Sequence, residues 1–380
     1  MSEHETTSAD PQSLVAEGQR SAVPALDFGS AWTYAPAPEA NDYIKLRPRF
    51  DLFIDGQWQA PKSGAYFDTI SPSTEQKLAE VAEANEADVD AAAAAARRAY
   101  DHVWSKLPAI ERGKYIYRIA RRIQERAREL AVVESMDGGK PIKESRDVDV
   151  PLAAAHFFYY AGWADKLKYA FPGATPRSLG VAGQVIPWNF PLLMAAWKLA
   201  PALACGNTVV LKPAETTPLT AMLLAEICQE VDLPPGVVNI VTGAGKTGSA
   251  LVNHPGVDKV AFTGSTAVGK NIQKALAGTK KKLTLELGGK AANIVFADAP
   301  IDQAIEGIIG GIFFNQGHVC CAGSRLLVEE SVAGLVIRKL KDRMASLRVG
   351  DPLDKNTDVG AINSRMQLEK IKELVASGEA

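Results

Sequence analysis

The chain has 380 residues, of which 47% are hydrophobic and 23% charged, and its 42 Lys and Arg against 44 Asp and Glu leave a formal net charge of −2. This balance argues against nucleic-acid binding, which needs a concentrated basic face, and no apolar run is long enough to cross a membrane. The length suits two or three domains with cores of their own. Four cysteines are too few for a disulfide framework, so we expect a cytoplasmic protein with free thiols.

The first part of the chain predicts a tail followed by mixed structure. Residues 1–45 are rich in Ser, Ala, Pro and Glu and lack a hydrophobic period, which predicts a flexible N-terminal tail. Residues 50–58 predict a strand and turn that open the folded part. Helical spacing of apolar residues predicts one helix over 86–100 and another over 110–136.

Short apolar strands alternate with helices from about residue 178. The expected strands are 179–186, 208–211, 237–242, 259–263 and 282–287. The expected helices between them are 192–204, 218–230, 245–253 and 267–277. This alternation predicts an α/β fold with a doubly wound parallel sheet, which binds ligands at the carboxyl ends of its strands. A second α/β unit is expected after residue 290, with strands 293–296 and 325–329 and helices 301–314 and 331–347.

Two glycine-containing segments are candidates for binding a phosphate. Residues 243–248 match GxGxxG after a strand, but position 268 carries no acidic residue to complete the dinucleotide fingerprint. The alternative is a turn that lets helix and sheet pack closely. The run from Phe262 to Gly269 places Ser265 and backbone N–H groups at a helix N-terminus, a natural anion site. Ser265 could equally be an ordinary helix N-cap.

A thiol and a carboxylate are the candidate reactive groups. Cys320 follows a helix that ends at a glycine, and it is either a small buried hydrophobe or, near His318, a nucleophile. A metal site is not expected, because no second CxxC or HxxxH cluster could complete the ligands. Glu286 lies at the end of an apolar strand, where burial would raise its pKa and suit a general base. It could instead simply bond to nearby backbone N–H groups.

Five motifs then occur in a familiar order. They are Ile186-Pro-Trp-Asn-Phe-Pro191, Leu211-Lys-Pro-Ala-Glu215, Phe262 to Gly269, Leu285 to Lys290, and Phe313 to Cys320. Together they resemble the aldehyde dehydrogenase superfamily over about residues 46–380. The resemblance implies a Rossmann-like cofactor domain, an α/β catalytic domain, and oxidation of an aldehyde to a carboxylic acid with NAD.

The resemblance also implies a role for each matching residue. Cys320 attacks the aldehyde to give a thiohemiacetal and then a thioester, Asn189 and the Cys320 N–H hold the oxyanion, and Glu286 activates the hydrolytic water. Glu215 favours NAD over NADP because its carboxylate repels a 2′-phosphate. Phe190 and Trp197 occupy positions that line the substrate tunnel in the family, although either could simply be a core residue, and Lys198 is a candidate proton relay. The residues implied at the cofactor are Ile186, Pro187, Trp188, Lys212, Glu215, Gly245, Phe262, Thr263, Gly264, Ser265 and Leu287.

The family pattern further predicts the domain organisation. We expect an NAD-binding domain over 46–162 and 181–286, a bridging hairpin over 163–180 that supports a homodimer or tetramer, and the first part of a catalytic domain over 287–380. No Glu-Ile-Phe-Gly-Pro segment follows Cys320, so we expect a fragment or a truncated gene product. His318 departs from the usual Gln or Glu. Alternative functions are a non-catalytic chain that binds NAD or a partner, and a thiol esterase without hydride transfer.

Overall fold

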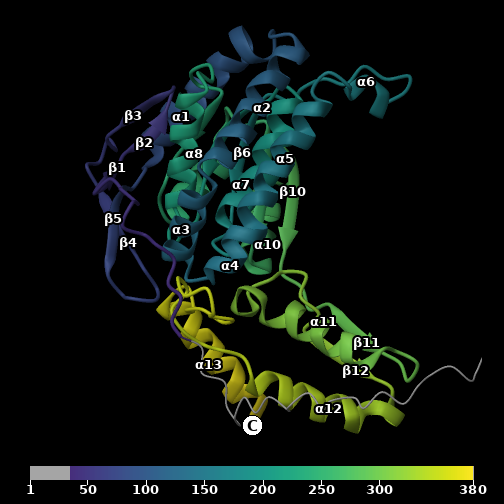
Figure 1. The fold of residues 1–380 in the computed structure, drawn as a ribbon. Coiled ribbons are helices and arrows are strands. Elements are labelled where there is room, and N and C mark those ends of the chain that lie inside the picture. Colours follow the sequence, from purple (N-terminus) through teal and green to yellow (C-terminus); the bar gives the residue numbers. More distant parts are fainter. Residues whose placement is uncertain (1–34, 380) are drawn as a thin grey trace, which may run out of the picture. The chain divides into compact units, whose positions relative to one another are not determined.

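A seven-stranded sheet forms the centre of residues 35–379, the part of the chain that the computed structural model describes (Figure 1). Its strands are β2 (Leu52–Ile54), β3 (Gln57–Gln59), β6 (Val181–Val185), β7 (Thr208–Lys212), β8 (Val238–Ile240), β9 (Lys259–Gly264) and β10 (Lys282–Leu287). Their order is β10-β9-β6-β7-β8-β2-β3. The strands from β10 to β8 are parallel, and the hairpin β2–β3 adds an antiparallel edge.

Helices cover both faces of this sheet, and its central strands are therefore buried on both sides. Val209 and Leu211 belong to one hydrophobic core and Val210 to the other, as expected when successive side chains point to opposite faces. One core includes α2 (Ala109–Glu125), α3 (Ala127–Gly138), α5 (Val150–Trp163), α7 (Pro191–Ala204) and α8 (Leu219–Glu230). The other includes α1 (Glu86–Ala99), α9 (Gly245–Asn253) and α10 (Thr266–Leu276). The predicted doubly wound α/β fold is confirmed.

Smaller elements surround this layered unit. A three-stranded sheet has the order β1-β5-β4 and consists of β1 (Arg49–Phe50), β4 (Tyr66–Ile70) and β5 (Lys77–Ala82). A π-helical turn spans Tyr100–Trp104 and another spans Ser145–Asp149. Two short helices are α4 (Ile142–Glu144) and α6 (Leu167–Ala170). The three-stranded sheet was not anticipated, because its exposed charged residues hide the alternation of a strand.

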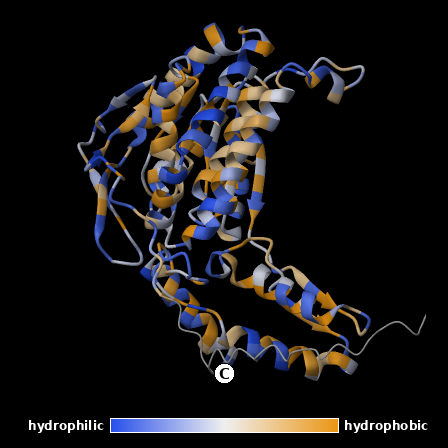
Figure 2. Ribbon diagram, in the orientation of Figure 1, coloured by the Kyte–Doolittle hydropathy of each residue, from blue (hydrophilic) through white to orange (hydrophobic). Residues whose placement is uncertain are grey.

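The second α/β unit has its own small core. Strands β11 (Ala292–Val295) and β12 (Arg325–Val328) pair in parallel, beside α11 (Ile301–Phe313) and α12 (Glu330–Ala345). A short 3-10 turn spans Phe314–Gly317, and α13 spans Arg365–Glu379. The two strands and α11 are predominantly apolar (Figure 2), and Ile294 and Leu327 remain more than half exposed. This sheet therefore keeps apolar surface in contact with solvent.

The single helix predicted over 110–136 is wrong. The structure has two helices, α2 and α3, separated at Arg126, whose backbone (φ −99°, ψ 16°) is not helical. The Arg126 guanidinium pairs with Glu129 at 2.7 Å and with Glu226 and Glu230 at 2.9 Å. The pairs with Glu226 and Glu230 connect the junction to α8, a tertiary contact that helical periodicity does not reveal.

Two further expectations about the chain need correction. Most of the predicted tail, residues 1–34, lies outside the described residues, but 36–45 pack against the fold: the Glu39 N–H donates to the Leu353 carbonyl at 2.7 Å, and its buried carboxylate pairs with Arg128. Residues 163–180 do not form a hairpin; they contain α6 and an extended stretch without strand pairing. A lone two-stranded hairpin is marginal in water, and this segment meets the sheet at its last residue, where the Thr208 N–H of β7 donates to the Gly180 carbonyl at 3.2 Å.

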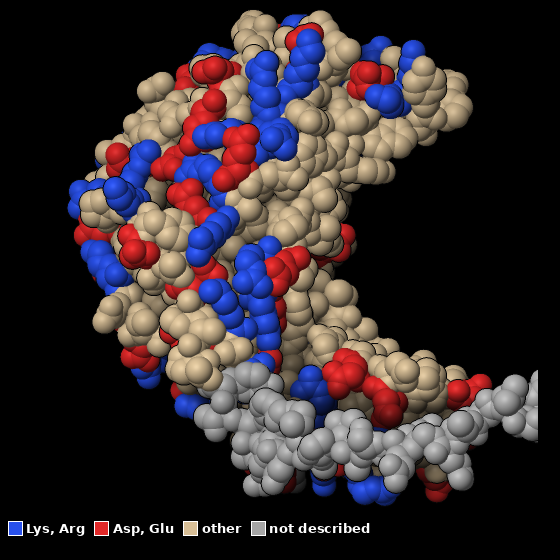
Figure 3. Space-filling model, in the orientation of Figure 1, with Lys and Arg blue, Asp and Glu red and all other residues tan. Residues whose placement is uncertain are grey.

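Charges of both signs are mixed over the surface. On the face drawn in Figure 3, Lys and Arg side chains lie among Asp and Glu side chains instead of gathering into one basic area. Within residues 35–379, no helix is both long and apolar enough to cross a membrane.

A matched pair of substitutions on α2 tests the assigned core. Ile116 is fully buried, whereas Ile110, on the same helix, is 57% exposed. We expect Ile116→Ala to lower the free energy of unfolding by about 2–5 kcal/mol, because it leaves a cavity. Ile110→Ala should change it by less than about 0.5 kcal/mol. Urea unfolding measures both, and equal effects would contradict the assigned burial.

Candidate active site

One cavity of about 330 Å³ brings together several of the predicted cofactor residues. Lys212 and Phe262 come from strands β7 and β9, and Gly245 begins α9. Because β7 and β9 are parallel, their carboxyl ends meet at one edge of the sheet, where such folds bind ligands. The lining residues are Val185, Lys212, Glu215, Gly245, Gly248, Ser249, Val252, Asn253, Phe262, Val268, Asn271, Ile272 and Ala275.

A buried lysine and a half-exposed glutamate form the polar part of this cavity. The Lys212 ammonium donates to the Pro213 carbonyl at 2.8 Å and lies 3.4 Å from a Glu215 carboxylate oxygen. Burial lowers the pKa of Lys212, and the Glu215 charge partly opposes this shift. The Glu215 side chain is 48% exposed, so its carboxylate remains available to a bound group.

The GxGxxG-like loop serves mainly to allow close packing. Gly243 has φ +144°, and a Cβ there would lie 2.2 Å from the Thr247 hydroxyl oxygen, so only glycine fits. Gly245 has no heavy atom within 4 Å of an added Cβ, and it faces the cavity. Of the two interpretations of this loop, the packing turn fits Gly243, while Gly245 leaves space for a ligand.

The segment from Phe262 to Gly269 forms the neighbouring wall. Ser265 is the N-cap of α10, since its hydroxyl accepts the Val268 N–H at 3.3 Å. A Cβ on Gly269 would lie 2.5 Å from a Leu287 methyl carbon, so α10 packs directly on β10. Phe262 is buried and lines the cavity, whereas Thr263, Gly264, Ser265 and Leu287 do not line it.

The segment from Ile186 to Asn189 connects the sheet to the cysteine loop. Ile186 is buried and donates its N–H to the Lys212 carbonyl at 3.1 Å. The Trp188 ring meets the His318 ring edge-on, with 4.7 Å between centroids. Ile186, Pro187 and Trp188 are absent from the lining of the 330 Å³ cavity, so the structure brings only part of the predicted cofactor set together.

Asn189 contacts the loop that carries the candidate nucleophile. Its side-chain amide donates to the His318 carbonyl at 2.8 Å, and its own carbonyl accepts the Asn315 side-chain amide at 2.6 Å. Asn189 therefore contacts the segment next to Cys320, and one of its two side-chain amide protons is already used in the hydrogen bond to His318. Burial lowers the pKa of His318 to about 4, so this imidazole is neutral at physiological pH and cannot stabilise a thiolate by its charge.

Cys320 and Cys321 are both exposed and free. Partial desolvation and the neighbouring Cys321 thiol raise the pKa of Cys320 above its ordinary value. A raised thiol pKa lowers the fraction of reactive thiolate at neutral pH. The Cys320 carbonyl oxygen lies 3.5 Å from where a Cβ of Gly289 would stand, which places the thiol loop beside the segment after β10.

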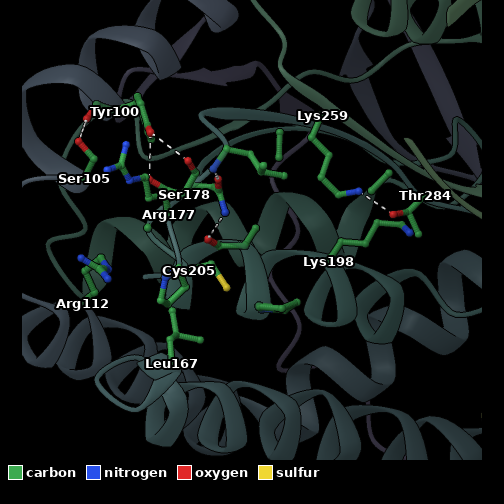
Figure 4. Close-up of a pocket in the computed structure, with 18 of the residues that line it drawn as sticks. Tyr100, Ser105, Arg112, Leu167, Arg177, Ser178, Lys198, Cys205, Lys259 and Thr284 are labelled. Carbon is green, nitrogen blue, oxygen red and sulfur yellow. Dashed lines mark hydrogen bonds between the residues drawn. The ribbon is translucent and has the colours of Figure 1, made fainter. Parts of the chain in front are cut away.

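Glu286 opens into a different and larger cavity of about 1050 Å³ (Figure 4), which Trp197 and Lys198 also line. Burial lowers the pKa of Lys198 to about 8, and the nearby Glu286 carboxylate opposes that shift. Glu286 is exposed on the same side of β10 as Thr284, whose hydroxyl accepts the Lys259 ammonium at 2.6 Å. Cys320 and Asn189 are not among the residues that line this cavity.

Phe190 is buried 4.1 Å from the Lys140 ammonium, measured to its ring centroid, and near Phe314. It is therefore a packing residue between α7 and the cysteine loop, whereas Trp197 is 46% exposed in the larger cavity. Sequence reasoning missed Glu144, whose carboxylate contacts the cysteine loop at Asn315. The local signal was Asn315 and Gly317, residue types that tolerate the left-handed conformation.

Comparisons with known proteins agree with this architecture. The model of the aldehyde dehydrogenase family matches residues 58–380. Human retinal dehydrogenase 2 is 46% identical over 359 residues, covering 91% of this chain and 68% of that protein. An aldehyde dehydrogenase of Alternaria alternata is 46% identical over 338 residues, covering 86% and 68%. The NAD⁺ complex of a Bacillus cereus aldehyde dehydrogenase superposes with a TM-score of 0.84 at 40% identity, covering 88% and 72%. The chain belongs to the aldehyde dehydrogenase family.

The pH dependence of Cys320 alkylation tests these electrostatics. Since the Cys321 thiol contributes to raising the pKa of Cys320, we expect Cys321→Ser to lower the pH midpoint of Cys320 alkylation. His318→Gln should leave that midpoint in place, because a histidine with a pKa of about 4 is already neutral there. Iodoacetamide labelling followed by peptide mass spectrometry measures both midpoints. A midpoint that moved only in His318→Gln would contradict this assignment.

Proposed function

We propose that this chain oxidises an aldehyde to a carboxylic acid with NAD, through covalent catalysis by Cys320. The observation that carries the proposal is the cavity shared by Lys212, Glu215, Gly245 and Phe262 at the carboxyl ends of parallel strands. Family membership supports aldehyde oxidation, and the Bacillus cereus relative of similar fold is an NAD⁺ complex.

The residues that line this cavity suit a dinucleotide whose ribose 2′-hydroxyl carries no phosphate. Lys212 and Glu215 would contact the adenosine ribose, and the N-terminus of α10 near Ser265 would face the pyrophosphate. Gly245 supports this fit, because nothing lies within 4 Å of an added Cβ there. When bound, NAD supplies the acceptor for the hydride removed from the substrate carbon.

The chain's own groups would perform the covalent chemistry. The Cys320 thiolate attacks the aldehyde carbon, and the resulting oxyanion accepts hydrogen bonds from the Asn189 amide and the Cys320 N–H. Loss of hydride leaves a thioester. Glu286 takes a proton from water, which attacks the thioester carbon, and the departing thiolate is restored as the carboxylic acid leaves.

Lys198 would pass on the proton that Glu286 collects. The lowered pKa of about 8 lets this ammonium give up and regain a proton near physiological pH. The shared cavity with Glu286 supports the relay, since both residues line it, and Figure 4 shows Lys198 at this cavity.

Self-association and a cytoplasmic location are further parts of the proposal. Residues 163–180 expose Tyr169 (67%) and Phe171 (53%), which favours a contact between copies in a homodimer or tetramer. The cysteines are all free, which suits a reducing compartment.

Replacing one thiol at a time tests the proposed nucleophile. We expect Cys320→Ser to abolish NADH formation from an aliphatic or aromatic aldehyde, because the hydroxyl is a far weaker nucleophile. Cys321→Ser is the matched control and should retain activity. Absorbance at the NADH band measures both. NAD binding without NADH from the wild-type chain would favour the non-catalytic role, and Cys320-dependent ester cleavage without any NADH would favour the esterase.

Substituting Glu215 tests the choice of cofactor. Glu215→Gln removes the charge that would repel a 2′-phosphate, so we expect the ratio of the Kd for NADP to that for NAD to fall by about tenfold, equivalent to about 1.4 kcal/mol. Glu111→Gln is the control, because Glu111 is not among the lining residues of this cavity. Calorimetric titration with each cofactor gives the ratio, and an unchanged ratio would remove Glu215 from this role.

A further inference from the structure

The turn that leads into Cys320 has an unusual backbone. Asn315 (φ 48°, ψ 45°) and Gln316 (φ 52°, ψ 29°) are both left-handed, and Gly317 follows at φ +79°. Such a conformation is disfavoured for residues with a Cβ, and glutamine is not among the residues that adopt it readily. Two successive non-glycine residues therefore need support from the surrounding structure.

That support comes from side-chain and backbone groups far away in the sequence. The Asn315 N–H donates to the Glu144 carboxylate at 2.8 Å, and both residues are almost fully buried, at 3% and 6% exposure. The Gln316 side-chain amide donates to the Gly139 carbonyl at 3.2 Å and to the Ala361 carbonyl at 2.8 Å. Each left-handed residue is thus held by a hydrogen bond to another part of the fold.

The same turn is connected to Asn189 on its other side. The Asn315 side chain donates to the Asn189 carbonyl, and the Asn189 side chain donates to the His318 carbonyl, two residues before the thiol. A continuous chain of hydrogen bonds therefore runs from Glu144 through Asn315 and Asn189 to the Cys320 loop. Moving Asn315 would move both the proposed oxyanion donor and the nucleophile.

We propose that Glu144 is a positioning residue: by accepting the Asn315 N–H, it holds the left-handed turn that sets Cys320 against Asn189. This inference rests on the proposed function, in which Cys320 is the nucleophile. Burial raises the pKa of Glu144 to about 7, and the Asn315 hydrogen bond opposes that shift. Such a costly burial is consistent with a role in fixing the loop.

The test compares Glu144→Ala with Glu144→Gln in the 380-residue chain. Glutamine keeps a side-chain oxygen that can accept the Asn315 N–H, whereas alanine removes it. The chemical probe is p-nitrophenyl acetate, which needs no cofactor: the Cys320 thiolate forms a bond to the acetyl carbon, and p-nitrophenolate leaves with the electrons of the broken C–O bond. Cys320→Ser gives the baseline, and Glu111→Ala is the control for loss of an exposed carboxylate.

We expect Glu144→Ala to slow Cys320-dependent p-nitrophenolate release by about tenfold or more, because small misplacements of a nucleophile have large effects on rate. Glu144→Gln should stay near the wild-type rate, and both should bind NAD with the wild-type Kd. Hydrogen exchange at residues 314–320 should accelerate in Glu144→Ala alone. Wild-type acylation in Glu144→Ala, or equal losses in both variants, would overturn the proposal.

Asn315 provides a second approach if Glu144→Ala does not fold. Asn315→Gly still tolerates the left-handed backbone but loses the side-chain hydrogen bond to the Asn189 carbonyl. Asn315→Ala loses that hydrogen bond and also disfavours the left-handed backbone. We therefore expect the acylation rate to be highest in the wild type, lower in Asn315→Gly and lowest in Asn315→Ala. Equal rates in all three would overturn the proposal. If the wild-type chain showed no Cys320-dependent release, the proposed function would fail, while hydrogen exchange in the Glu144 and Asn315 variants would still decide whether this bond holds the turn.

Discussion

Burial of the central parallel strands on both faces is the constraint on which the rest of this structure depends. Val209 and Leu211 face one helical layer and Val210 the other, so each layer buries one face of β7. The carboxyl ends of the parallel strands coincide at one edge of this sheet, where Lys212 and Glu215 line a cavity. The cavity at this edge, lined by residues of α9 and α10, is where we propose that the cofactor binds.

Hydrogen-bonded polar groups restrict the geometry of the candidate site. Glu144, Asn315 and Asn189 form successive hydrogen bonds in a region from which water is largely excluded. In such surroundings an unpaired polar group is costly, so a satisfied chain of bonds favours one loop geometry over others. Because the pKa of the exposed Cys320 thiol is raised, the proposed role of Cys320 depends on its position more than on a permanently ionised state.

The sequence was most informative where the structure is locally determined. The strand and helix at 208–211 and 218–230 were predicted almost to the residue, because apolar runs of these lengths have few alternatives. The helix over 110–136 was wrong, because ion pairs of Arg126 with α8 divide it. The strands at 66–82 were missed, since half-exposed strands with charged residues lack a clear apolar alternation.

The same distinction between local and tertiary information applies to the candidate site. The motifs around Asn189, Glu286 and Cys320 could be recognised from the sequence, because each is a local run of residues whose chemistry depends on residue type. Their spatial relations could not be derived in this way: Glu144 and Asn315 are 171 positions apart, and Lys198 and Glu286 meet only across a shared cavity. The sequence by itself therefore determined the family, the layered fold and the candidate reactive groups. Only the tertiary structure decided which of those groups face one another, because contacts between distant segments depend on how the layers pack.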